Sequence, residues 1–235
     1  MRRVYESVAT RSTEDGWGVT LDDRPLRTPA RRELRVPSEP LATAIAAEWD
    51  AQDPDIRPET MPLTRLATTA IDRTTERRTE IAAEVANYAG TDLVCYRAGH
   101  PPTLAARQEA AWQPLIDWAA GRYDAGLAVT AGIVPLPQSP ASLKAYAAAV
   151  TALDDFRLTV VHAATAACGS LVIALALLEG RLDAEAAFEV SQLDETFQIE
   201  AWGEDAEAAR RRDAVAGDIK AAARFLDLLG RSRDN

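Results

Sequence analysis

The chain has 235 residues, 47% of them hydrophobic, and a formal net charge of −10 at pH 7. This length allows one large domain or two small ones with a buried core, and the composition excludes wholesale disorder. Affinity for nucleic acids and for anionic membrane surfaces comes from basic side chains, so the acidic balance disfavours both classes of partner.

The N-terminal part of the chain is expected to form β-structure. Val4–Val8, Trp17–Leu21 and Leu34–Val36 are short runs in which apolar and polar residues alternate, and clusters of turn-forming residues separate them. Ser38 is a suitable N-cap for the helix that follows, with Pro40 in its first turn. Residues 1–60 are therefore predicted to be a small antiparallel β-rich domain with a connecting helix.

The rest of the chain, residues 61–235, is predicted to be a larger and mainly α-helical domain. Apolar residues recur at helical spacing, and two short strands are expected, at 91–96 and 127–130. The expected helices cover 63–71, 79–88, 104–120, 142–152, 155–179, 183–202 and 206–229. The predicted fold class is α+β.

One apolar run is long enough to raise the question of a membrane span. The 21 residues from Leu158 to Leu178 carry no formal charge, a length that can cross a bilayer. However, polar residues and many alanines dilute the run, and no aromatic belt or basic flank accompanies it. A buried core helix is favoured over a membrane span, which stays open as an alternative.

The search for catalytic, metal and cofactor sites finds no candidate. The chain has two histidines, His100 in a turn and His162 in the apolar run, and no closely spaced cysteine pair. Neither a phosphate-binding loop nor a nucleophile elbow is present. His162 is interpreted as a core histidine, and Cys95 and Cys168 as buried free thiols. An unusual enzyme with a carboxylate-based site remains an alternative.

An acidic block is the most informative feature of the charge pattern. Between Leu182 and Ala209 there are nine acidic residues and no lysine or arginine. Aromatic and aliphatic residues lie among them, and Arg210–Arg212 follow at once. Acidic residues that border aromatic ones suit a surface that attracts and binds a basic partner, but a solvated helix face explains the pattern equally well.

Four segments, in order along the chain, resemble the Atp-twelve family of ATP synthase assembly chaperones. The four segments are Trp17–Pro29, Met61–Asp72, Gly90–Arg97 and Asp194–Asp205. The resemblance extends from the N-terminus to about residue 226. One small departure is Asp22-Asp23, where the family usually has an Asp-Gly turn.

This resemblance implies a function and a partner. The family binds the free alpha subunit of the F-one sector and shields its interface until the beta subunit docks. It implies a β-rich N-terminal domain and a helical C-terminal domain, and no cofactor. A transit peptide precedes the mitochondrial members, so its absence here implies a bacterial cytoplasmic protein, which we expect to be a monomer. No stable membrane insertion is expected.

The resemblance also suggests which residues bind the client, that is, the protein being held. The acidic C-terminal motif of the family corresponds here to Glu200, Asp194, Glu195, Gln198, Trp202 and Asp205. Met61–Asp72 is a possible second surface, with Thr64, Arg65, Thr68 and Asp72 exposed, although its apolar stripe first indicates a core helix.

Overall fold

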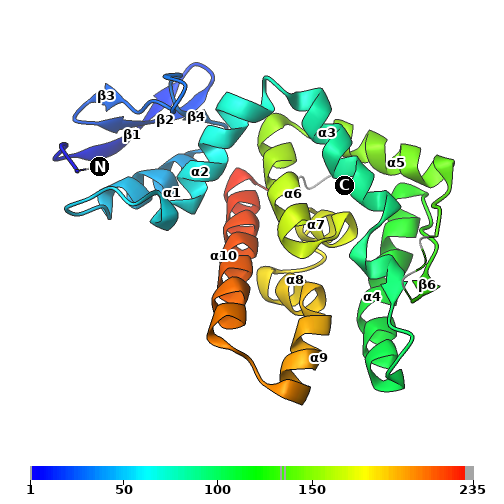
Figure 1. The fold of residues 1–235 in the computed structure, drawn as a ribbon. Helices are drawn as coiled ribbons and strands as arrows, with labels where there is room; N and C mark the ends of the chain where they lie inside the picture. Colours follow the sequence, from blue (N-terminus) through cyan, green and yellow to red (C-terminus); the bar gives the residue numbers. More distant parts are fainter. Residues whose placement is uncertain (1, 133, 135, 231–235) are drawn as a thin grey trace. The chain divides into compact units, whose positions relative to one another are not determined.

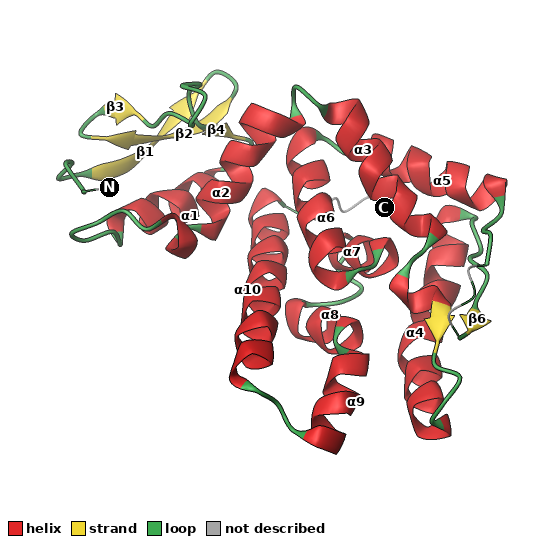
Figure 2. Cartoon of the chain, viewed as in Figure 1, coloured by secondary structure: helices red, strands yellow, loops and turns green. Residues whose placement is uncertain are grey.

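The computed structural model describes residues 2–132, 134 and 136–230 and groups them into two compact units. The first unit contains the chain up to Arg78, Asp154–Val160 and the described residues from Arg224. The second contains Thr79–Leu153 and Val161–Ala223. An antiparallel sheet comes first and helices dominate the rest, so the predicted α+β class is confirmed (Figure 2). The sequence predicts two domains that meet between residues 60 and 61, and this division stays a prediction.

A small sheet forms the N-terminal part of the first unit. Its strands are β1 (Val8–Thr13), β2 (Gly16–Leu21), β3 (Arg24–Pro25) and β4 (Arg35–Val36). Strand β2 is central and pairs antiparallel with the other three. The strand predicted at 17–21 is confirmed, and the one predicted at 34–36 is confirmed over Arg35–Val36.

The strand predicted at Val4–Val8 is wrong, because β1 begins at Val8. The backbone N–H groups of Glu6 and Ser7 both donate to the Asp22 carboxylate, at 2.9 Å each. The N–H groups of these two residues are therefore bound by a side chain instead of by a neighbouring strand.

Two helices pack beside this sheet within the first unit. They are α1 (Glu39–Asp50), which contacts β1 and β2, and α2 (Pro62–Thr69), which contacts α1 (Figure 1). Ser38 caps α1 as predicted, since its side chain accepts a hydrogen bond from the Leu41 N–H. A 3₁₀ turn, η1 (Pro58–Thr60), precedes α2, and a wider helical turn, η2 (Ala70–Thr74), continues it.

The second unit is almost entirely helical. Its elements before the long apolar run are α3 (Arg78–Asn87), the 3₁₀ turns η3 (Tyr88–Gly90) and η4 (Leu93–Cys95), β5 (Tyr96–Arg97), α4 (Pro102–Tyr123), β6 (Thr130–Ala131) and α5 (Pro140–Thr151). The later elements are α6 (Asp155–Cys168), α7 (Leu171–Leu178), α8 (Ala184–Ser191), α9 (Leu193–Trp202) and α10 (Ala206–Leu229). The first residues of α6 and the last of α10 belong to the first unit.

Helix α7 is the centre of the second core. Each of its residues from Leu171 to Leu177 is buried, and α4, α8 and η3 pack against it. A helix that is apolar all round needs such complete cover.

The long apolar run folds as two helices instead of the one predicted over 155–179. Gly169 has a φ of +66°, and the Ser170 side chain then caps α7. No helix in the described part of the chain is long and apolar enough to cross a membrane. The helix predicted over 183–202 is likewise divided, at Gln192, into α8 and α9.

The strand predicted at 91–96 is also wrong over most of its length. Asp92 is fully buried, and its carboxylate accepts hydrogen bonds from the N–H groups of Val94, at 3.2 Å, and Val172, at 3.1 Å. The backbone therefore turns into η4, and only Tyr96–Arg97 form a strand, β5, paired in parallel with β6. The predicted strand 127–130 overlaps β6 only at Thr130.

The two cysteines are buried, whereas His162 is partly exposed. Cys95 and Cys168 are buried free thiols as predicted, and burial raises the pKa of each to about 12. His162 is not a core residue, since its side chain is 27% exposed and lies 3.4 Å from the Glu84 carboxylate. The sequence missed this because the polar neighbour comes from a different helix, α3.

Candidate functional site

A pocket of about 310 Å³ lies between α9 and the first half of α10, within the second unit. Its lining residues are Gln192, Glu195, Gln198, Ile199, Trp202, Gly203, Glu204, Asp205, Ala208, Arg211, Arg212 and Val215. Four of the six residues that the sequence assigned to client binding line it. In the described part of the chain, no three His, Cys, Asp or Glu side chains come close enough together to hold a metal ion.

A three-residue turn creates the pocket. Helix α9 ends at Trp202 because Gly203 adopts a φ of +83°, which L-residues rarely adopt. The Asp205 side chain then accepts hydrogen bonds from the N–H groups of Glu207 and Ala208, both at 2.8 Å, and so caps α10. These two bonds hold the pKa of Asp205 below its usual value.

Three of the six predicted residues are held by contacts inside the second unit. Asp205 is the cap of α10. The Asp194 carboxylate accepts a hydrogen bond from Gln108, a fully buried residue of α4, at 2.7 Å. Glu200 forms an ion pair with Arg107 of α4, at 2.7 Å. These acids attach α9 to α4 and start α10, so they shape the site.

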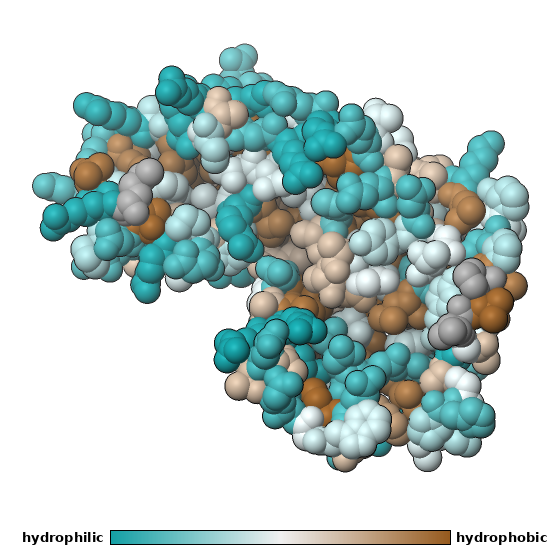
Figure 3. Space-filling view, in the orientation of Figure 1, coloured by the Kyte–Doolittle hydropathy of each residue, from teal (hydrophilic) through white to brown (hydrophobic). Residues whose placement is uncertain are grey.

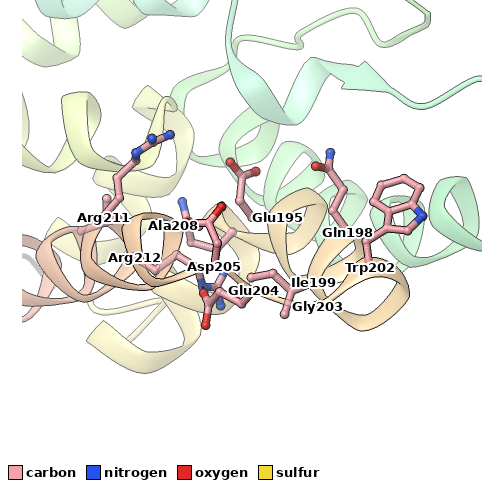
Figure 4. A pocket seen from close by; sticks show the side chains of 12 residues that line it. Glu195, Gln198, Ile199, Trp202, Gly203, Glu204, Asp205, Ala208, Arg211 and Arg212 are labelled. Atoms are coloured by element: carbon pink, nitrogen blue, oxygen red, sulfur yellow. Dashed lines mark hydrogen bonds and ion pairs between the residues drawn. The ribbon is translucent and has the colours of Figure 1, made fainter.

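The other three are Glu195, Gln198 and Trp202. They stand at positions i, i+3 and i+7, which places them along one face of α9. Figure 4 shows that all three side chains project to the same side. Among the described residues, none of these side chains has a hydrogen-bond or ion-pair partner. Trp202 is 80% exposed, an unusual state for a tryptophan.

The sequence missed the basic side of the pocket. Arg211, 73% exposed, projects to the same side as Glu195 (Figure 4). The Arg212 guanidinium lies over the Phe188 ring, 5.2 Å from its centroid. Its Nε is 3.3 Å from the Glu204 carboxylate. The sequence shows the Arg210–Arg212 run, and the signal that places it in the pocket is the spacing of residues 208, 211, 212 and 215 on one face of α10.

The helices that form the pocket are poorly covered. No residue of α9 is buried, and residues 206–218 of α10 contain no buried residue either. On the face seen in Figure 3, hydrophilic side chains with single hydrophobic ones between them cover this region.

The possible second surface, Met61–Asp72, is largely structural. Thr64 is buried, contrary to expectation, because its N–H and hydroxyl both donate to the Glu48 carboxylate of α1. Asp72 accepts hydrogen bonds from the Thr28 hydroxyl, at 2.7 Å, and the Ala30 N–H, at 2.9 Å. Arg65 is exposed as expected, and Thr68 is half-buried.

The alternative of a carboxylate-based enzyme depends on Glu195 and Glu200 meeting in one pocket. Only Glu195 lines the pocket, and Glu200 is paired with Arg107. The geometry therefore does not bring Glu195 and Glu200 together in this pocket.

The chain is similar to known proteins over nearly its whole length. The family profile for the ATP12 chaperone protein matches residues 2–120. The structure of Atp12 from Paracoccus denitrificans superposes with a TM-score of 0.93 at 44% identity, covering 97% of this chain and 98% of that one. A protein of Agrobacterium tumefaciens gives a TM-score of 0.92 at 37% identity, covering 97% and 86%. The mitochondrial protein atp12 of Schizosaccharomyces pombe is 25% identical over 226 residues, 90% of this chain and 78% of the relative.

Proposed function

The chain belongs to the ATP12 chaperone family, and we propose from this that it assists assembly of the F-one sector of ATP synthase. It binds the free alpha subunit and covers the interface of that subunit until the beta subunit docks. The similarity to Paracoccus denitrificans Atp12, over 97% of the chain, carries this proposal.

The protein acts in this proposal by binding alone. It works as a monomer in the bacterial cytoplasm, and it needs neither a catalytic residue nor a cofactor. The acidic block supports this view, because it offers charged and aromatic side chains to a partner.

The six predicted residues have two roles in the proposed client-binding surface. Glu195, Gln198 and Trp202 contact the client, since their side chains project from α9 and have no other partner among the described residues. Asp194, Glu200 and Asp205 hold α9 and α10 in the position that presents those contacts.

The test is recovery of partners from the native cell with the tagged full-length chain. We expect the alpha subunit to be the main protein recovered and purified beta subunit to release it. Glu6→Lys, a charge reversal at an exposed residue outside the acidic block, is the control and should recover as much alpha subunit as the wild type. Recovery of other proteins without the alpha subunit would refute the proposal.

A further inference from the structure

Helix α9 and the first half of α10 lack the cover that normally stabilises helices in a protein. Short helices are marginal in water, and most of their stability comes from burying an apolar face. Here no residue from Leu193 to Trp202, and none from 206 to 218, is buried. A third helix along the pocket would provide the missing packing, as in any helical bundle.

The pocket already has the composition of a groove for such a helix. Ile199, Ala208 and Val215 give it an apolar lining from both α9 and α10, and each is partly exposed. Its volume of about 310 Å³ is many times the minimum that one water molecule needs. That is room for side chains that point into the groove, with the backbone of the partner lying along its opening.

We propose that this groove binds an amphipathic helix of the client, which carries a basic residue opposite Glu195 and an apolar residue, two turns away, against Trp202. The inference rests on the proposed chaperone function and adds the chemistry that the site recognises. Amphipathic helices that dock in grooves through residues on one face are a common mode of peptide recognition.

The spacing of the two contacts follows from α9 itself. Glu195 and Trp202 are seven residues apart, which is about 10 Å along a helix axis at 1.5 Å per residue. A docked helix that runs along the groove meets both side chains only if its own two contact residues are also about seven apart. Gln198, between them, is available for a polar residue of the same face.

The charges select the partner. Glu195 forms no ion pair among the described residues, whereas Glu200 and Glu204 are paired with Arg107 and Arg212. A carboxylate without an ion-pair partner favours a basic residue. Arg211 projects from the α10 side of the groove, so the matching edge of the partner helix is neutral or acidic. Opposite charges on the two edges fix the orientation of the helix.

A photo-crosslinking experiment tests the occupant directly. The full-length chain carries benzoylphenylalanine at Gln198 and is mixed with purified alpha subunit. We expect crosslinks to one helix of the alpha subunit that has a basic and an apolar residue about seven apart. The same group at Glu185, an exposed acid of α8 outside the pocket, is the control and should give no such crosslink.

Two variants test the contacts. Trp202→Ala and Glu195→Lys should each weaken alpha-subunit binding at least tenfold with the thermal unfolding curve unchanged, because both side chains are exposed and unpartnered in the described chain. Glu185→Lys, with the same charge change, should bind like the wild type. Reversing the crosslinked basic residue of the client to glutamate should restore binding to Glu195→Lys.

The outcomes separate the inference from the proposed function. If the wild type binds alpha subunit but the two variants bind equally well, or the crosslinks fall on a strand or a loop, the groove inference is wrong and the chaperone function stands. If the wild type binds no alpha subunit, the proposed function fails and the inference fails with it.

Discussion

Glu200 illustrates how a single contact changes the role of a residue. It lies in a sequence block without lysine or arginine, yet it forms an ion pair with Arg107, whose guanidinium also lies over the Phe197 ring at 5.3 Å. Both side chains of the pair are about half exposed, 50% for Arg107 and 51% for Glu200. A pair of this kind contributes less than about 1 kcal/mol to stability.

Glu200→Lys should therefore lower the free energy of unfolding slightly, by less than about 1 kcal/mol, because a lysine there faces Arg107. It should also weaken alpha-subunit binding by displacing α9 from α4. The double variant Arg107→Glu, Glu200→Lys restores the pair and should recover both properties, as measured by urea denaturation and by a binding assay. A double variant that is stable but still binds weakly would make Glu200 a direct contact.

Asp92 makes stability depend on pH. Burial raises the pKa of this carboxyl from 3.8 to about 6, although three backbone N–H groups and the Ser170 hydroxyl oppose the change. The folded state therefore binds the proton more tightly than the unfolded state. The stability that Asp92 contributes is present below about pH 4 and is lost as the pH rises through 6.

The wild type should lose about 1 kcal/mol of stability from this group between pH 5 and pH 8. Asp92→Asn does not titrate, so the difference in unfolding free energy between wild type and variant should shrink by that amount over the same range. The variant should be the less stable protein at pH 5, because an amide has one acceptor oxygen for the Val94 and Val172 N–H groups. If the unfolding free energies of the wild type and of Asp92→Asn changed in parallel with pH, the raised pKa of Asp92 would be contradicted.

At the scale of elements, three carboxylates decide where helices and strands begin. Asp22 binds the N–H groups of residues 6 and 7, Glu48 binds those of Leu63 and Thr64 at the start of α2, and Asp92 binds those of Val94 and Val172. Two of these, Asp22 and Asp92, bind N–H groups of segments whose predicted strands proved wrong. Side-chain acceptors compete with strand pairing for the same donors.

The break between α6 and α7 depends on Gly169. Its φ of +66° lies in the left-handed region, while an added Cβ would meet nothing closer than the Leu93 Cβ at 4.0 Å. Gly169→Ala should therefore destabilise the protein by about 1–2 kcal/mol through backbone strain alone. Gly121→Ala is the matched control, since Gly121 lies inside α4 with nothing within 4 Å, and it should stabilise by up to about 1 kcal/mol. Urea denaturation of both variants checks the contrast, and equal effects would refute it.

At the scale of the whole molecule, the proposed function predicts activity without nucleotide. The sequence contains no phosphate-binding loop, so the purified protein should suppress aggregation of unassembled alpha subunit without ATP. Light scattering measures this, with Trp202→Ala as a folded variant that should protect poorly. A strict requirement for ATP hydrolysis by this chain would refute the prediction.

The sequence by itself determined the order of β-structure and helices, the start of α1 at Ser38 and the membership of the chaperone family. These features depend on local signals, namely side-chain caps, apolar periodicity and ordered motifs. The sequence also located the acidic segment in which the proposed client-binding surface lies, and it named Glu195, Gln198 and Trp202 within that segment.

Only the tertiary structure decided which acidic residues are available to a partner. Asp194 and Glu200 differ from Glu195 because Gln108 and Arg107, which lie 86 and 93 residues earlier in the chain, come to rest beside them. Helical spacing places residues of one helix relative to each other, but it carries no information about the neighbouring helix. The packing of α4 and α10 against α9 therefore decides which face of α9, the one with Glu195, Gln198 and Trp202, stays free for a partner.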